Sequence, residues 1–190
     1  MVRHEHSIVI DAPVEEVFDY VNDPNSMPEW LVGMVETRNP IGSGEGLQYE
    51  WTYKMIGLQL RGQSVVVDYI HNECATHQGI GMIQSLWTNR VEANESGTKL
   101  TMEVEYTLPI LVLGKLAEHL TARRNEREIE LSLMNLKETL EGRSRWHSHS
   151  VSSRVRQRGT PGRRGSHGSR KNAMGVSRDG SACKGGRKNR

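Results

Sequence analysis

The sequence predicts an α+β domain over residues 1–142 and a basic tail over residues 143–190. Three features of the first 142 residues support the domain: segments in which apolar and polar residues alternate, two short helical segments near the N-terminus, and one long helical segment at 111–140. Consecutive antiparallel strands with a helix on one face form an α+β domain. A domain of this length buries about two-thirds of the surface of its unfolded chain, which is enough for a core.

The N-terminal region predicts one strand followed by two short helices. Residues 5–11 alternate as a strand does. Pro13 suits the first turn of a helix, and a second short helix is expected at 25–30. The apolar residues of the first helix recur at helical spacing: Val14, Val17, Phe18 and Val21.

The central region predicts about six strands in an antiparallel meander. Alternation is strict at 47–55 and 100–108, which indicates strands with one buried face. Residues 94–97 have the composition of a hairpin turn. The other strands are expected at 32–39, 58–71, 76–84 and 86–93.

The long helix at 111–140 does not carry a single apolar stripe. Leu113, Leu116 and Leu120 mark one register, whereas Ile129, Leu133, Leu136 and Leu140 mark another. Between them, residues 121–128 are strongly polar. Two interpretations stay open: the middle of the helix crosses a partly polar cavity, or the helix bends and its charges are solvated.

Charge divides the chain into two parts. Residues 1–142 contain 11 Lys and Arg against 22 Asp and Glu, whereas residues 143–190 contain 14 against 1. The tail is rich in Arg, Ser and Gly and has few branched apolar residues, so it is expected to be disordered. It is an arm for nucleic acid or an anionic membrane surface, a solvated extension without a partner, or translated sequence that selection did not shape.

Composition also bears on the compartment. The sequence contains two cysteines, Cys74 and Cys183, which are too few for the disulfide framework of a small secreted domain, so a reducing interior is expected. Residues 1–6 lack the apolar run of a signal peptide, and the longest apolar stretch, 108–113, is too short for a transmembrane segment. The sequence therefore predicts a cytoplasmic protein.

The order of these elements resembles the SRPBCC superfamily, which includes START, Bet v 1 and polyketide cyclase/dehydrase proteins. Residues 8–21 are similar to its opening strand and helix, Asn22-Asp23-Pro24 with Pro28-Glu29-Trp30 to its next landmark, and 97–101 to the turn into its last strand. The resemblance covers residues 3–142. It implies a helix-grip fold, in which a curved antiparallel sheet of about six or seven strands surrounds the long C-terminal helix and leaves an apolar cavity.

The inward faces of this fold supply the candidate ligand-binding residues. Aromatic, apolar and methionine side chains with a few polar groups are typical of a pocket for an apolar molecule. Each is equally a candidate for ordinary core, where its burial contributes about 1.5–3 kcal/mol. The candidates are Trp51, Tyr53, Met55, Val67, Tyr69, Trp87, Asn89, Met102, Val104, Tyr106, Leu116, Leu120, Asn125, Glu126 and Ile129.

Glu126 and Tyr106 are the candidate catalytic residues. A buried Glu126 would have a raised pKa suited to acid–base chemistry, whereas on a solvated helix face it would be one charge among several arginines. We expect no cofactor and no metal, because no spacing of the histidines suggests three convergent ligands. The glycine-rich loop at 42–46 precedes a strand, not a helix, and so does not indicate a nucleotide site.

Three functions remain open, because superfamily members bind lipids, sterols, quinones, hormones or polyketides, and only some catalyse cyclisation or dehydration. The first is carriage, storage or sensing of a small hydrophobic molecule such as a lipid, quinone or polyketide. The second is an enzyme of the cyclase or dehydratase kind. The third is an interaction protein whose basic tail binds nucleic acid or an anionic membrane.

Overall fold

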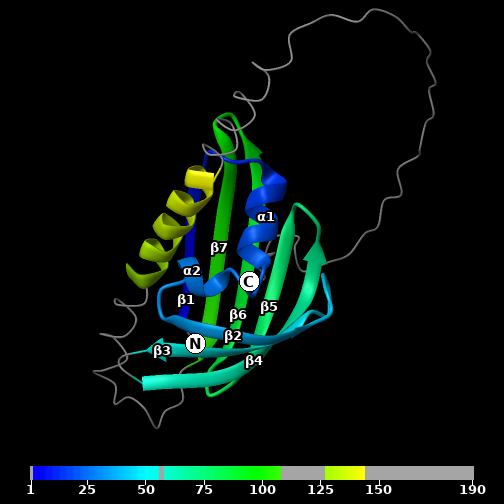
Figure 1. Cartoon of the computed structure of the whole chain (residues 1–190), viewed down its shortest axis with the longest axis vertical. Coiled ribbons are helices and arrows are strands. Elements are labelled where there is room, and N and C mark those ends of the chain that lie inside the picture. The colour runs from blue at the N-terminus through cyan, green and yellow to red at the C-terminus, as the bar shows by residue number, and fades with distance from the viewer. Residues whose placement is uncertain (1, 56–57, 108–126, 144–190) are drawn as a thin grey trace, which may run out of the picture.

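The computed structural model describes residues 2–55, 58–107 and 127–143. Within these residues, seven strands form one antiparallel sheet in the order β1-β7-β6-β5-β4-β3-β2 (Figure 1). The elements are β1 (Val2–Ile10), α1 (Val14–Asn22), α2 (Met27–Trp30), β2 (Met34–Ile41), β3 (Gln48–Met55), β4 (Leu58–Ile70), β5 (Cys74–Gly81), β6 (Gln84–Asn94) and β7 (Gly97–Thr107). Residues 127–143 are helical.

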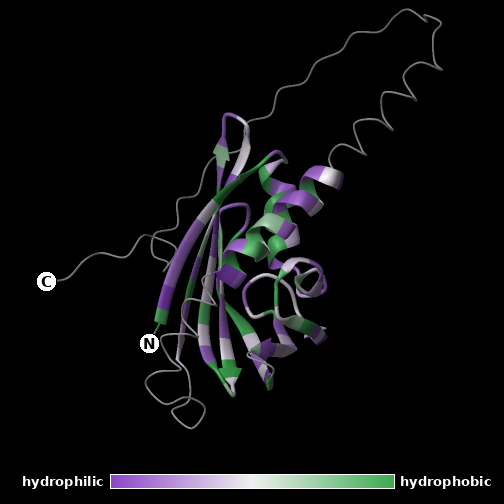
Figure 2. Ribbon diagram, turned by 90° about the vertical axis from the view of Figure 1, so that its left-hand side faces the viewer, coloured by the Kyte–Doolittle hydropathy of each residue, from purple (hydrophilic) through white to green (hydrophobic). Residues whose placement is uncertain are grey.

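The strand order explains why the helices cover one face of the sheet. Strands β2 to β7 follow one another as a meander, whereas β1 pairs with β7 at the opposite edge. The chain must therefore cross the whole sheet between β1 and β2, and it does so through α1 and α2. Figure 2 shows both helices and residues 127–143 on the same side of the curved sheet. The predicted α+β, helix-grip architecture is confirmed.

The core lies between this face of the sheet and the helices. Phe18 of α1 and Leu100 of β7 have no exposed surface, and neither have Leu136 and Leu140. The second predicted register of the long helix is therefore buried, whereas Leu131 and Met134 at other positions of residues 127–143 are exposed. The first register, with Leu116 and Leu120, lies outside the described residues.

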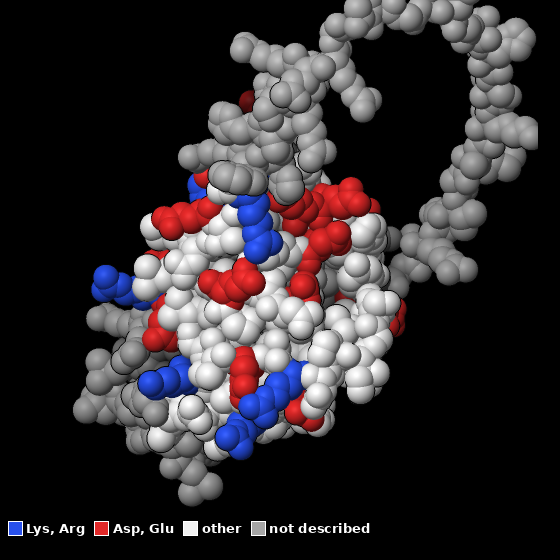
Figure 3. All heavy atoms as spheres, viewed as in Figure 1, with Lys and Arg blue, Asp and Glu red and all other residues white. Residues whose placement is uncertain are grey.

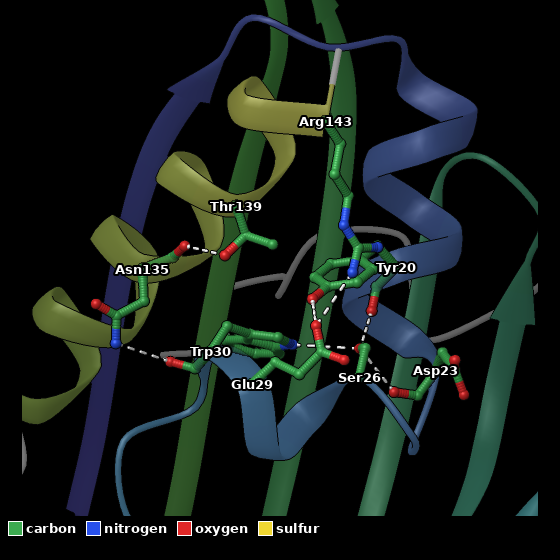
Figure 4. A network of polar contacts seen from close by, with 8 residues as sticks. All are labelled: Tyr20, Asp23, Ser26, Glu29, Trp30, Asn135, Thr139 and Arg143. Carbon is green, nitrogen blue, oxygen red and sulfur yellow. Dashed lines mark hydrogen bonds and ion pairs between the residues drawn. The ribbon is translucent and has the colours of Figure 1, made fainter. Parts of the chain in front are cut away.

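Residues 127–143 are fastened to the N-terminal helices by polar contacts as well as by packing (Figure 4). The Arg143 guanidinium forms an ion pair with Glu29 at 3.1 Å and lies 4.4 Å from the centre of the Tyr20 ring. The Tyr20 hydroxyl donates to the same Glu29 carboxylate at 2.5 Å, and burial together with this hydrogen bond raises the pKa of Tyr20 to about 12. Asn135 donates to the Trp30 carbonyl oxygen at 3.3 Å. These contacts hold the helix over α2.

A β-bulge in β4 corrects one prediction from the alternation pattern. The pairing of β4 with β5 shifts between Val66 and Asp68, so that Val67 has no partner in the ladder. Such a bulge reverses which face successive residues occupy. Before the bulge the strand alternates regularly, so Val66 is buried and Val67 is 40% exposed. After the bulge Tyr69 faces inward against Phe18. Strict alternation predicted that Val67 and Tyr69 share the inward face, and the structure shows that they do not.

The surface carries the acidic charge that composition predicts for the domain. Figure 3 shows acidic side chains gathered over the end of the molecule where α1 lies. Glu15 and Glu16 stand in the first turn of that helix, where the helix dipole favours negative charge. Of the helices that the structure describes, none has the length and hydropathy needed to cross a membrane.

Candidate functional site

A cavity of about 90 Å³ lies between the inner face of the sheet and the helices. Both helices contribute to its wall, as do residue 129 and every strand except β1. By a comparable measure one water molecule needs about 10–15 Å³, so the space is several waters large. No described lining residue is Asp, Glu, Lys or Arg. The cavity therefore suits an uncharged, largely apolar molecule.

Eight of the predicted ligand-binding residues line this cavity. They come from β3, β6, β7 and the helical residues 127–143, and they are Trp51, Tyr53, Met55, Trp87, Asn89, Val104, Tyr106 and Ile129. Of these, Tyr106 was also a candidate catalytic residue. The structure thus brings most of the predicted strand residues together around one space.

The remaining candidates do not line the cavity or lie outside the described residues. Met102 is completely buried in the core, and Val67 lies on the exposed face of β4 next to the buried Val66. Tyr69 packs edge-on against Phe18, with ring centres 5.4 Å apart, and borders a separate surface groove. Leu116, Leu120, Asn125 and Glu126 fall outside the described residues, so the catalytic role considered for Glu126 stays a prediction.

Other lining residues were not singled out from the sequence. They are Val21, Met27, Trp30, Leu31, Met34, Tyr49, Ser64, His77, Ile83 and Ser85. Tyr49 lies on the same alternating face of β3 as Trp51, so the pattern already contained it. The α2 residues Met27 and Trp30 carry no such signal, because only the crossing of the sheet brings them over the cavity.

Trp51 is positioned by a glycine on the neighbouring strand. Trp51 pairs with Gly62 across β3 and β4. A Cβ atom added to Gly62 would lie 2.3 Å from Cζ2 of Trp51 and 2.6 Å from the Ile80 carbonyl oxygen. Only glycine therefore leaves room for the indole to lie flat across the sheet beside the cavity.

Four buried polar side chains, which we call the polar network, meet at one part of the wall: Asn22, Tyr49, His77 and Asn89. The Tyr49 hydroxyl lies 3.1 Å from Nδ1 of His77, and Nε2 of His77 lies 3.1 Å from Oδ1 of Asn22. Nδ2 of Asn89 donates to the same Asn22 oxygen at 3.0 Å. Three of these residues come from β3, β5 and β6, and Asn22 ends α1.

The hydrogen bonds determine the tautomer of His77. Nδ2 of Asn22 donates to the Phe18 carbonyl oxygen at 2.8 Å, so the Oδ1 atom must be the one that faces His77. Because Oδ1 can only accept, Nε2 of His77 carries the proton. In the neutral ring, Nδ1 is then an acceptor, and Tyr49 donates to it. The hydrogen bonds of the network therefore all run one way: Tyr49 donates to His77, and His77 donates to Asn22.

Burial keeps the polar network uncharged. It lowers the pKa of His77 to about 4, so the imidazole is neutral at neutral pH. It also raises the pKa of Tyr49 to about 12, against the opposing effect of a hydrogen bond with Ser64. Burial, with smaller contributions from Glu128 and Tyr106, raises the pKa of Tyr53 as well. Tyr49 and Tyr53 therefore remain protonated at neutral pH.

One atom of the polar network has no hydrogen-bond partner in the part of the chain that the structure describes. Oδ1 of Asn89 is buried and accepts no hydrogen bond from any described residue. The whole Asn89 residue is 3% exposed.

As for metals, the described residues contain no group of three or more His, Cys, Asp or Glu side chains that could hold an ion.

The sequence of this domain matches a known family along most of the chain. Residues 1–141 match the family described as polyketide cyclase / dehydrase and lipid transport. The chain belongs to this family. No curated protein matches it in sequence.

Solved structures agree with the family at the level of the fold. A protein of Thermus thermophilus is 20% identical, with a TM-score of 0.63 over 75% of this chain and 98% of that one. The di-domain ARO/CYC StfQ of the steffimycin biosynthetic pathway is 16% identical, with a TM-score of 0.60 over 75% of this chain and 52% of its own. Zhui aromatase/cyclase from a Streptomyces species is 11% identical, with a TM-score of 0.56 over 75% of this chain and 93% of that one.

Proposed function

We propose that residues 1–142 form a domain that binds a small apolar molecule, such as a lipid, quinone or polyketide, in the cavity, and that the protein carries, stores or senses it. The observation that carries this proposal is the uncharged cavity walled by Trp51, Tyr53 and Trp87. An apolar molecule that enters this space removes apolar surface from water, which favours its binding. A ligand that binds only the folded chain raises stability with the logarithm of its concentration relative to its dissociation constant.

The first test is to identify what the protein carries. The full chain is purified from cells and denatured, and the released small molecules are analysed by mass spectrometry. We expect an apolar compound at close to one molecule per chain. An empty protein that also takes up no fluorescent apolar probe would contradict the proposal.

A pair of variants connects the ligand to the cavity. Ser85 lines the cavity and its neighbour Gln84 is exposed, so the same large side chain can be placed inside or outside. Ser85→Trp is expected to fill the space and lower the amount of bound compound at least about tenfold, because the ligand and the indole compete for one volume. Gln84→Trp is expected to leave binding unchanged. Equal binding by both variants would place the ligand elsewhere.

The second candidate function is catalysis of the cyclase or dehydratase kind. It is supported by the aromatase/cyclase names of two structural neighbours and by the position of Tyr106 on the cavity wall. His77 is poorly suited to proton transfer, because its pKa of about 4 makes it a weak base and both ring nitrogens are engaged. Turnover of an aromatic polyketide that Tyr106→Phe abolishes would favour the enzyme, and binding without turnover would favour the carrier.

The basic tail and the compartment stay predictions. Residues 144–190 lie outside the described residues, so a nucleic-acid or membrane partner for 143–190 rests on charge alone. A cytoplasmic location is likewise part of the proposal. A truncation after residue 143 is expected to retain the ligand and to lose any salt-sensitive binding to polyanions.

A further inference from the structure

The oxygen of the Asn89 side chain, which has no donor among the described residues, indicates the chemistry of the ligand. The inference drawn from it rests on the proposed function. Asn89 is 3% exposed and lines the cavity. Its Nδ2 atom is used, since it donates to Asn22. Its Oδ1 atom is buried and has no donor among the described residues. Buried acceptors are normally paired, and because Asn89 lines the cavity, a group within the cavity is the candidate donor.

The orientation of the Asn89 amide cannot be reversed to remove this acceptor. Exchanging its oxygen and nitrogen would place two oxygens, those of Asn89 and Asn22, against each other. Asn22 cannot turn to compensate, because its Nδ2 atom donates to the Phe18 carbonyl oxygen at 2.8 Å. The contacts of Asn22, the last residue of α1, therefore fix the Asn89 amide so that its oxygen is the atom without a donor.

The neighbouring groups do not supply the missing donor. Tyr49 donates to Nδ1 of His77, and the proton on Nε2 of His77 points to Asn22. The donors of these residues are therefore directed along the network and away from Asn89. A water molecule can occupy the position when the cavity holds no ligand.

We propose that the ligand of this cavity is a neutral, largely apolar molecule with a hydroxyl group, and that Oδ1 of Asn89 accepts the hydrogen bond from that hydroxyl. A ketone, an ether or a carboxylate has no donor and would direct an oxygen at another acceptor. An ammonium group would find no opposite charge, because no described lining residue is acidic. A hydroxyl supplies one donor without a charge.

The test compares pairs of probes that have nearly the same shape and differ in the donor. Phenol and toluene form the aromatic pair, and cyclohexanol and methylcyclohexane form the aliphatic pair. Binding is followed in the full-length protein through the fluorescence of the tryptophans, three of which line the cavity. We expect the hydroxyl member of at least one pair to bind about tenfold more tightly, because the methyl member leaves the buried acceptor unpaired. The pair with the larger preference shows whether the ligand is a phenol or an aliphatic alcohol.

Variants assign the preference to Asn89. In Asn89→Leu, which keeps the size of the side chain and removes the acceptor, we expect the preference to disappear while toluene still binds. Gln84→Leu makes a similar exchange of amide for isobutyl at an exposed position of the same strand and is expected to keep the preference. If Asn89→Leu does not fold, anisole on the unaltered protein replaces it: it should bind no better than toluene.

The outcomes separate this inference from the proposed function. Equal binding of hydroxyl and methyl probes to the unaltered protein would overturn the role of Asn89 and leave apolar binding intact. A preference that persists in Asn89→Leu would also overturn it. If no probe of either pair binds, the cavity itself is not a ligand site, and the proposed function falls as well.

Discussion

The polar network and the aromatic part of the wall border the same cavity but are held in place by different forces. Asn22, Tyr49, His77 and Asn89 are joined by directional hydrogen bonds of 3.0–3.1 Å. By contrast, Trp51 is held by packing, with its indole across Gly62. Under the proposed function, this comparison implies a division of tasks: the aromatic wall would supply contact area for a ligand, and the polar network would orient it.

This difference also predicts how each region responds to change. Apolar packing is lost in proportion to the volume removed, whereas a hydrogen-bonded network is damaged by the loss of one partner that leaves another unsatisfied. The network further depends on pH, because its central residue His77 is a buried base. Packing around a tryptophan does not depend on pH, because the indole does not titrate in this range.

The largest effect is expected from Trp51→Ala. Trp51 is 9% exposed, and its removal should lower the free energy of unfolding by about 3–5 kcal/mol, because the side chain contributes both transfer energy and filled volume. Urea denaturation measures this loss. Trp51→Phe serves as the control and should lose much less. A loss below about 1 kcal/mol for Trp51→Ala would mean that packing does not hold this region.

The next effect is the pH dependence that His77 contributes. Its pKa falls from an ordinary 6.5 to about 4 in the folded protein, so only the unfolded chain takes up the proton between these values. The contribution of His77 to the free energy of unfolding is therefore fully present well above pH 6.5. It declines by about 3 kcal/mol as the pH falls to 4. Urea denaturation at pH 7.5 and about pH 4.5 should show this decline.

His77→Gln isolates that contribution, since its amide does not titrate. Its stability relative to the unaltered protein should improve by about 2–3 kcal/mol on acidification, because the carboxylates act alike in both proteins and cancel. Parallel pH profiles for the two proteins would show that His77 is not buried as a neutral base.

The smallest effect is expected from Tyr49→Phe. This change removes the donor to Nδ1 of His77 and leaves a buried acceptor without a partner, so the free energy of unfolding should fall by about 1–2 kcal/mol. Tyr53→Phe makes the same change further along the same face of β3, away from His77, and should cost less. Equal losses would mean that the network hydroxyl contributes no more than an ordinary one.

The comparison between the two regions also separates what could and could not be predicted. Strict alternation in β3 placed Trp51, Tyr53 and Met55 on one inward face, and the structure confirms that they border one cavity. Alternation failed between Val67 and Tyr69, because a bulge depends on the pairing of two strands and leaves no mark in the period of one. Periodicity alone therefore predicts a wall only where the ladder is regular.

By itself, the sequence determined the order of the elements, the inward face of β3 and the buried register of residues 127–143, since each follows from local periodicity. The tertiary structure alone decided the polar network. Asn22 lies 55 positions from His77 and 67 from Asn89, and they meet because the chain crosses the sheet between β1 and β2. A hydrogen bond between side chains requires atoms to lie within about 3 Å, and no local pattern encodes a distance between distant residues.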